Sequence, residues 1–126
     1  MLPRLRHKAM AVRTKSIYEK VEPGDGFRLL VMRRWPRGVR KDAVDEWDRE
    51  LGTPDDVIDD WKANRIEWSE LRKRYRRAMK EQGKRIGELA VRAGHETVTL
   101  LCGCTDESRC HRSLLKELIE ASGKDA

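Results

Sequence analysis

The chain has 126 residues, of which 28 are Lys or Arg and 22 are Asp or Glu, so its formal net charge at pH 7 is +6. This length corresponds to one domain with a single core. No apolar stretch approaches the roughly 20 residues of a membrane-spanning helix, and the basic start lacks the apolar run of a secretory signal, so we expect a cytoplasmic protein with reduced cysteines and no membrane partner.

The first part of the chain predicts two short strands. Residues 1–12 are basic, and we expect them to form a flexible extension ahead of a single domain at 13–126. Ile17 is the centre of a predicted strand at 15–19, and an apolar run predicts a second strand at 27–32. The turn VEPGDG between them is too short for a helical crossover, so the two strands either pair antiparallel or the first lies at a sheet edge.

An arginine-rich segment, RRWPRGVR at residues 33–40, directly follows the second strand. Planar guanidinium groups bind phosphate or carboxylate through paired hydrogen bonds, which an ammonium group cannot do. Pro36 and Gly38 favour a defined loop conformation. We predict that Arg34 and Arg37 bind an anionic ligand. The alternative is a solvated basic loop whose tryptophan packs on the core.

Three amphipathic helices are predicted after the arginine segment. The first spans 42–52, where apolar residues recur at helical spacing. The second begins at Thr53, a favourable N-cap residue that Pro54 and two aspartates follow. The third spans 68–79 and is expected to resume after Gly83.

The outer face of the third predicted helix is strongly basic. Arg72, Arg76 and Lys80 recur there every four residues, among further Lys and Arg side chains. Such a face can follow a phosphate backbone, which would make the protein a nucleic-acid-binding module without catalysis. The alternative is a solvated face that the acidic segment at 41–60 neutralises within the fold.

The stretch TVTLLCGCTDESRCHRS, residues 97–113, holds all three cysteines of the chain. Its β-branched and aliphatic start predicts an interior strand at 97–102. Apolar residues at helical spacing then predict a final helix that ends near Gly123. Because ligands of open α/β sheets bind beyond the carboxyl ends of the strands, the loop between this strand and the final helix is the candidate site.

Two chemistries involve the Cys-His-Arg sequence in this loop. In an enzyme, Cys110 would be the nucleophile or redox thiol, His111 the acid or base and Arg112 the charge stabiliser. In a binding protein, the same residues and Arg109 would hold an anion together with the arginine segment. Plain packing and helix capping remain the alternative for each residue taken alone.

Metal binding is a further alternative. Cys102, Cys104, Cys110 and His111 are four soft ligands, the number that a closed zinc site needs. A C-x-C pair followed by C-H is not the usual zinc-knuckle spacing, and no second ligand pair exists elsewhere. Zinc is therefore the less favoured assignment, and we otherwise expect no cofactor.

Three stretches in this order, VMRRWPRGVRKDAVDEW, WSELRKRYRRAM and VTLLCGCTDESRCHRSLLKELIE, resemble the small bacterial and archaeal proteins catalogued as domain of unknown function 488, in particular the YeaO-like branch. The resemblance covers residues 15–121. That branch usually has an aspartate where this chain has Met32, and Asn-His-Ala where it has Cys110, His111 and Arg112. The resemblance implies a compact α/β fold that brings the two loops close together, and it implies no activity.

These observations predict one compact α/β domain with a small, mostly parallel sheet flanked by helices. The predicted ligand is a phosphorylated small molecule or a nucleic acid, bound between the arginine segment and the Cys-His-Arg loop. Whether the chain catalyses a reaction on that ligand stays open at this stage.

Overall fold

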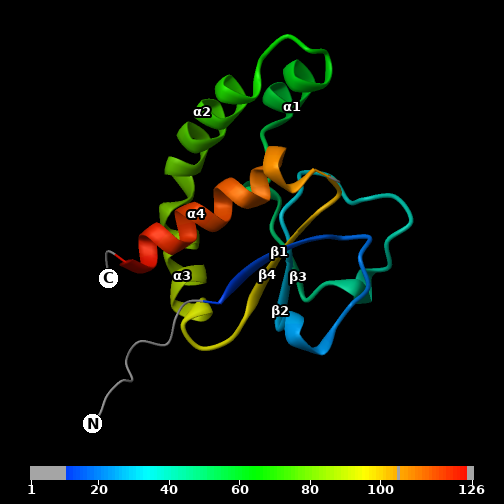
Figure 1. The fold of residues 1–126 in the computed structure, drawn as a ribbon, viewed down its shortest axis with the longest axis vertical. Helices are drawn as coiled ribbons and strands as arrows, with labels where there is room; N and C mark the ends of the chain where they lie inside the picture. The colour runs from blue at the N-terminus through cyan, green and yellow to red at the C-terminus, as the bar shows by residue number, and fades with distance from the viewer. Residues whose placement is uncertain (1–10, 105, 125–126) are drawn as a thin grey trace.

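A computed structural model describes residues 11–104 and 106–124 of the chain. It contains a parallel sheet of four strands in the order β1-β4-β2-β3 (Figure 1). The strands are β1 (Val12–Ser16), β2 (Phe27–Leu30), β3 (Glu46–Trp47) and β4 (Val98–Cys102). The most apolar strand, β4, lies between β1 and β2 and is buried along its whole length. The predicted α/β fold with a small parallel sheet is confirmed.

The α-helices of the described part are α1 (Asp55–Lys62), α2 (Trp68–Met79), α3 (Gly83–Ala93) and α4 (His111–Lys124). Helices α2, α3 and α4 lie together on one side of the sheet (Figure 1). α4 packs on β1 and β4, and α3 packs on α4 and β4. Short 3-10 turns lie between these elements, at Pro23–Asp25, Lys41–Ala43, Arg49–Leu51, Lys80–Gln82 and Glu107–Arg109.

Two apolar clusters lie on opposite faces of the sheet, because successive side chains of a strand point to opposite sides. Leu29 and Leu100 belong to the larger cluster, which the helices cover. Leu30, Leu101 and Ile17 form the smaller cluster on the other face. Partly buried residues between β2 and the end of β3 pack against this smaller cluster, namely Met32, Trp35, Val39, Val44 and Trp47. Loops therefore cover the second face where helices cover the first.

The second face also buries three charged residues, Lys15, Asp25 and Arg28. The Asp25 carboxylate accepts a hydrogen bond from Lys15 Nζ at 3.0 Å and another from Arg28 Nη1. The Thr99 hydroxyl donates to the Asp25 carbonyl at 2.6 Å. These contacts fasten the turn before β2 to β1 and β4, and they supply each buried charge with an opposite partner.

The predicted helix at 42–52 is wrong, because this segment forms two 3-10 turns around the short strand β3. The Trp47 indole N–H donates to the Met32 carbonyl at 2.7 Å. The backbone N–H of Arg28 donates to the Asp45 carboxylate at 2.8 Å, and the Asp45 N–H donates to the Arg28 carbonyl. These contacts with β2 hold the segment extended. Its apolar residues have helical spacing, but they are divided between the two clusters.

The other predicted elements differ from the structure mainly at their ends. β1 begins three residues earlier than predicted and lies at the sheet edge, which is one of the two predicted arrangements. The N-cap of α1 is Pro54 and not Thr53. Gly83 is the first residue of α3, and α4 begins at His111 and includes Gly123.

Most of the predicted N-terminal extension, residues 1–10, lies outside the described residues. The last two residues of the predicted extension are described: the Ala11 N–H donates to the Ala93 carbonyl at 3.1 Å, and Val12 is the first residue of β1. Among the helices that the structure describes, none is both long enough and apolar enough to span a membrane.

Candidate functional site

Two loops leave neighbouring carboxyl ends of the sheet, because β2 and β4 pair in parallel. The arginine loop (residues 33–40) follows β2, and the cysteine loop (residues 102–111) follows β4. Both loops line one pocket of about 540 Å³. Its lining includes Arg33, Arg34 and Arg37 from the arginine loop and Cys102, Cys104 and His111 from the cysteine loop. The proximity that the family resemblance implied is therefore present.

The arginine loop has a defined conformation. The Trp35 indole N–H donates to the Val39 carbonyl at 2.9 Å, and the Tyr18 hydroxyl donates to the Arg37 carbonyl at 3.2 Å. The Trp35 ring packs edge-on against Trp47, with 5.3 Å between the ring centroids. The tryptophan is thus docked on the core, as the alternative interpretation of this loop supposed. Arg34, Arg37 and Arg40 stay exposed, whereas the half-buried Arg33 donates to the Gly52 carbonyl and pairs with Glu50 at 3.6 Å.

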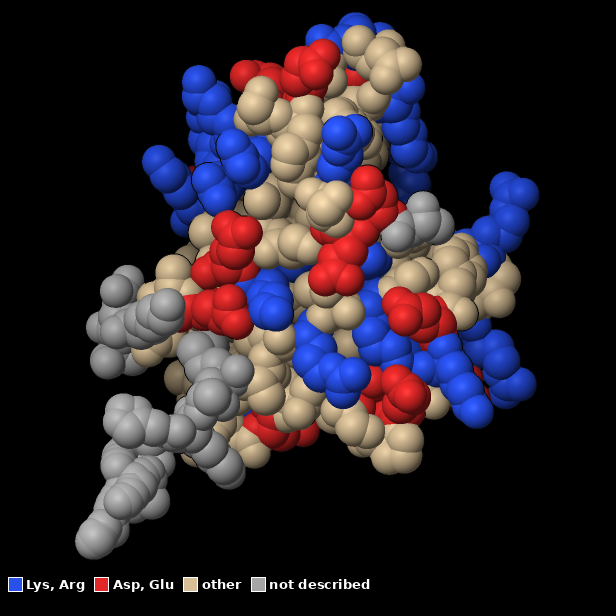
Figure 2. Space-filling model, in the orientation of Figure 1, with Lys and Arg blue, Asp and Glu red and all other residues tan. Residues whose placement is uncertain are grey.

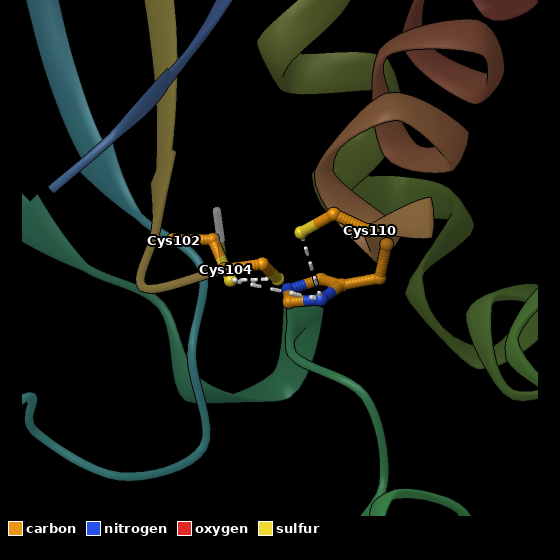
Figure 3. A group of neighbouring side chains, drawn as sticks. Cys102, Cys104 and Cys110 are labelled. Carbon is orange, nitrogen blue, oxygen red and sulfur yellow. Dashed lines mark hydrogen bonds between the residues drawn. The ribbon is translucent and has the colours of Figure 1, made fainter. Parts of the chain in front are cut away.

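Three cysteines and one histidine meet where β4 ends and α4 begins. The sulfur atoms of Cys102, Cys104 and Cys110 and Nδ1 of His111 all lie within 4.8 Å of one another. Figure 3 shows the three thiols converging from the end of β4 and the start of α4. We call these four residues the Cys/His cluster. The three cysteines are free thiols.

Local structure brings the members of the Cys/His cluster together. Cys102 ends β4, and the chain bends at Gly103, which brings the Cys104 sulfur to 3.3 Å from the sulfur of Cys102. The loop then reverses through the 3-10 turn Glu107–Arg109, where the Asp106 carboxylate accepts hydrogen bonds from the N–H and hydroxyl of Ser108. The reversal places Cys110 directly before α4 and His111 as the first residue of that helix.

His111 is buried, and one hydrogen bond fixes its orientation. Its Nε2 lies within hydrogen-bond distance of the Val31 carbonyl, which can only accept, so Nε2 carries the proton. Nδ1 then presents its lone pair to the thiols, 3.9 Å from the sulfur atoms of both Cys102 and Cys110. Burial lowers the pKa of His111, although the bond to Val31 opposes that shift, so the imidazole is neutral at pH 7.

The three thiols differ in the direction in which their pKa is shifted. Hydrogen bonds from the thiols of Cys104 and Cys110 lower the pKa of Cys102, and the nearby Arg112 guanidinium acts in the same direction. The same interaction with Cys102, together with burial, raises the pKa of Cys104 and of Cys110. The interaction among the thiols therefore favours Cys102 as the first of the three to lose its proton.

The predicted site residues fall into two groups. Arg34, Arg37 and His111 line the pocket. Cys110 and Arg112 are buried and are not part of the lining, and Arg109 is exposed in the 3-10 turn, also outside the lining. The Arg112 guanidinium instead donates from Nη1 to the carbonyl oxygens of Cys104 at 3.0 Å and Cys102 at 3.4 Å. Arg112 therefore holds the backbone of the cysteine loop.

Helix α1 forms a wall of the pocket that the sequence did not indicate. It contributes the apolar residues Ile58 and Trp61 and the charged residues Asp55, Asp59 and Lys62. Asp55 and Asp59 are one helical turn apart, so the sequence already places them on one face of α1. The sequence does not show that this face of α1 points toward the arginine loop, because tertiary packing decides that orientation. Asp55 lies 3.9 Å from an Arg34 nitrogen in a solvent-exposed pair.

The predicted nucleic-acid face of α2 is a separate surface. A shallow groove of about 480 Å³ runs along it, lined by Ser69, Arg72, Lys73, Arg76, Arg77 and Lys80. Figure 2 shows Lys and Arg side chains gathered over α2. The acidic residues Asp56 and Asp60 pair with Arg74, which does not line the groove.

Comparisons with known proteins agree with the resemblance seen in the motifs. The uncharacterized protein YeaO of Escherichia coli (strain K12) is 27% identical over 117 residues, which cover 89% of this chain and 99% of YeaO. The uncharacterized protein Rv3073c of Mycobacterium tuberculosis (strain H37Rv) is 31% identical over 111 residues, which cover 86% of this chain and 92% of that protein.

No solved structure gives a significant match to the chain. A family model described as the active DUF488-N3 subclade matches residues 12–123, which is nearly the whole of the part of the chain that the structure describes. The chain therefore belongs to the DUF488 family and, within it, to the DUF488-N3 subclade.

Proposed function

We propose that this protein is cytoplasmic and binds a phosphate-bearing ligand, either a small molecule or a nucleotide, in the pocket between the arginine loop and the Cys/His cluster. One observation carries the proposal: Arg33, Arg34 and Arg37 line the same pocket as Cys102, Cys104 and His111. The pocket lies beyond the carboxyl ends of parallel strands, where α/β proteins bind their ligands.

The charge of the pocket favours an anion. Four cationic side chains line it, from the three arginines and Lys62, against the two carboxylates of Asp55 and Asp59. Arg37 has no ion pair among the described residues, and the 3.9 Å pair between Arg34 and Asp55 is exposed and weak. Both guanidinium groups are available to a phosphate without first giving up a strong partner.

The pocket also limits which groups of the cluster meet the ligand. The thiols of its lining are Cys102 and Cys104, whereas Cys110 is buried outside it. His111 faces the cluster with an unprotonated Nδ1, so it accepts a proton or a hydrogen bond there and does not donate one. We assign the pocket a binding role, with Arg34 and Arg37 as the ligand-binding residues.

Binding is tested by titrating inorganic phosphate and nucleoside monophosphates into the protein, followed by calorimetry and by the fluorescence of Trp61 in the pocket wall. We expect Arg37→Ala to weaken binding by roughly tenfold to a hundredfold, the value of a hydrogen bond to a charged group. Arg40→Ala is the matched control, because Arg40 lies in the same loop, pairs with Asp42 and does not line the pocket. Equal effects of the two variants, or no binding by the wild type, would contradict the proposal.

A second candidate function, nucleic-acid binding by α2, is favoured by the unneutralised groove. Among the described residues, Arg72, Lys73, Arg77 and Lys80 form no ion pair, and Arg76 pairs with Glu117 at 3.0 Å across an exposed contact. The acidic segment neutralises Arg74 of α2 through Asp56 and Asp60 and leaves the residues that line the groove without an acidic partner from that segment.

The test of the second candidate is charge reversal. We expect the triple variant with Arg72, Arg76 and Lys80 changed to Glu to lose binding to a short labelled duplex, measured by fluorescence anisotropy, and we expect wild-type binding to fall steeply with salt. A control triple at Arg40, Lys41 and Arg49 changes the net charge equally at exposed positions outside α2. If both triples behave alike, net charge and not the α2 groove governs binding.

A further inference from the structure

Four atoms of the types that zinc binds meet at one point. The sulfur atoms of Cys102, Cys104 and Cys110 and Nδ1 of His111 lie within 4.8 Å of one another. A tetrahedral zinc ion with bonds of about 2.3 Å to sulfur and about 2.0 Å to nitrogen places its ligand atoms roughly 3.5 to 3.8 Å apart. The separations are 3.3 Å between Cys102 and Cys104 and 3.9 Å from His111 to Cys102 and to Cys110. We propose that the Cys/His cluster binds one Zn²⁺ ion in a closed Cys3His site.

The unusual spacing of the ligands does not prevent this geometry. In a zinc knuckle, a tight turn brings two cysteines together across two intervening residues. Here the end of β4 and the bend at Gly103 bring Cys102 and Cys104 together, and Cys110 and His111 stand at the start of α4. The two ligand pairs come from two different elements, so the site depends on the strand, loop and helix arrangement and not on a local motif.

The orientation of His111 is the one that metal-binding histidines adopt. Such a residue donates its other ring N–H to a backbone carbonyl or carboxylate, which fixes the tautomer and the ring plane. His111 makes this contact with Val31, the residue that follows β2, and presents Nδ1 to the three sulfur atoms. The Tyr75 ring packs beside the imidazole, with 5.5 Å between the ring centroids. The imidazole is thus held in place before any metal arrives.

Arg112 supplies the charge that a three-thiolate site needs. Three thiolates and one Zn²⁺ sum to a single negative charge, and the thiols that are still protonated release their protons when the metal binds. Arg112 is buried next to the cluster, and its Nη1 donates to the carbonyl oxygens of Cys102 and Cys104. One buried cation therefore stands beside one net negative charge, and the same side chain fixes the loop that carries two of the ligands.

With four protein ligands the coordination shell is full, so the ion has a structural role. It would tie the end of β4 to the start of α4 and hold the cysteine loop as a wall of the pocket. The two proposals can still be tested apart: Arg37→Ala removes a pocket donor and leaves all four metal ligands, so this variant should lose phosphate affinity and keep its zinc.

The first experiment measures metal in the full chain, purified under reducing conditions without chelator. We expect one zinc per chain by elemental analysis, and no thiol that reacts with a disulfide reagent until chelator is added. Cys104→Ser is the informative variant, because Cys104 is the least buried of the three cysteines and its replacement disturbs the core least. We expect it to lose most of the zinc, whereas Ser108→Ala, in the same loop but not a ligand, keeps it.

The second experiment does not depend on a variant. Chelator-treated wild-type protein is titrated with Co²⁺, which in a tetrahedral thiolate site produces intense visible absorption and near-ultraviolet charge-transfer bands. We expect one equivalent to bind, to be displaced by Zn²⁺ and to raise the thermal midpoint. The proposal is overturned if the wild type holds no zinc and binds no Co²⁺, if a disulfide removes two thiols in the native protein, or if Cys104→Ser and Cys110→Ser both keep full zinc.

Discussion

At the scale of single residues, Tyr75 joins the core to the candidate site. Its side chain is fully buried, and its hydroxyl donates to the Leu51 carbonyl at 2.7 Å. Leu51 ends the 3-10 turn that leads into α1, while the Tyr75 ring packs beside His111. One side chain of α2 thus supports both the connection to the α1 wall of the pocket and the imidazole of the Cys/His cluster.

We predict that Tyr75→Phe lowers the free energy of unfolding by about 1 to 3 kcal/mol, because it leaves the Leu51 carbonyl buried without a donor. Urea denaturation measures the difference. Tyr18→Phe is the matched control: that hydroxyl also donates to a backbone carbonyl, at Arg37, but Tyr18 is 60% exposed and water replaces the lost bond. The control should change stability by less than about 0.5 kcal/mol. An equal loss in both variants would show that burial does not decide the cost.

At the scale of elements, the start of β2 depends on a glycine. Gly26 has φ of 63°, and a Cβ at this position would lie 2.3 Å from the Thr97 carbonyl oxygen. The close approach is what lets the Phe27 N–H donate to that oxygen at 2.8 Å and sets the register of β2 against β4.

We predict that Gly26→Ala lowers the free energy of unfolding by more than about 1 kcal/mol, because it adds a clash to an unfavourable backbone conformation. Gly83→Ala is the matched control, since Gly83 opens α3 with helical φ and ψ and a Cβ there meets nothing within 4 Å. The control should be neutral or stabilising by up to about 1 kcal/mol. Thermal denaturation compares the two, and a Gly26→Ala protein as stable as the control would refute the argument.

The elements that the sequence predicts well are those whose burial is uniform. β4 is apolar throughout because both of its faces are covered, and α2 keeps its apolar residues on one face because only that face packs. The segment at 42–52 is mispredicted because its apolar side chains serve two clusters on opposite faces of the sheet, which one-dimensional spacing cannot distinguish from a single helical face.

The site is predictable only in part for the same reason. The sequence indicates that Cys102, Cys104, Cys110 and His111 lie in one loop, and the sheet rule places that loop near the arginine loop. Whether four side chains converge within 4.8 Å depends on how far the loop reverses, which nonlocal contacts of Arg112 and His111 decide. Spacing alone therefore does not show that the four side chains converge.

At the scale of the whole molecule, the two faces of the sheet are stabilised differently. The helix-covered face is apolar, whereas the loop-covered face combines a small apolar cluster with the buried charges of Lys15, Asp25 and Arg28. Asp25 is the only acid among these three and pairs with both cations, while Lys15 has a second, exposed carboxylate partner in Glu22 at 3.3 Å. The stability of the loop-covered face should consequently vary with pH.

Asp25→Asn tests this dependence. Burial would raise the pKa of Asp25, but hydrogen bonds from the Glu22 N–H, Lys15 and Arg28 outweigh it and hold the pKa below the ordinary 3.8. A carboxyl whose pKa is lower in the folded state stabilises the fold above pH 3.8, and this contribution disappears as the pH falls through the lower, folded value. At pH 7 the variant should lose about 3 to 5 kcal/mol of the free energy of unfolding, because the buried Arg28 loses its carboxylate partner and Lys15 keeps only the exposed Glu22.

The difference in the free energy of unfolding between wild type and Asp25→Asn should become smaller below about pH 4, where the wild-type carboxyl also loses its charge. Urea denaturation across pH 3 to 7 measures it. Asp42→Asn is the control, because Asp42 pairs with Arg40 in an exposed contact and should change stability by less than about 0.5 kcal/mol at every pH. If this difference in the free energy of unfolding stays constant down to pH 3, the Asp25 side chain stabilises the fold through its shape and hydrogen bonds and not through its negative charge.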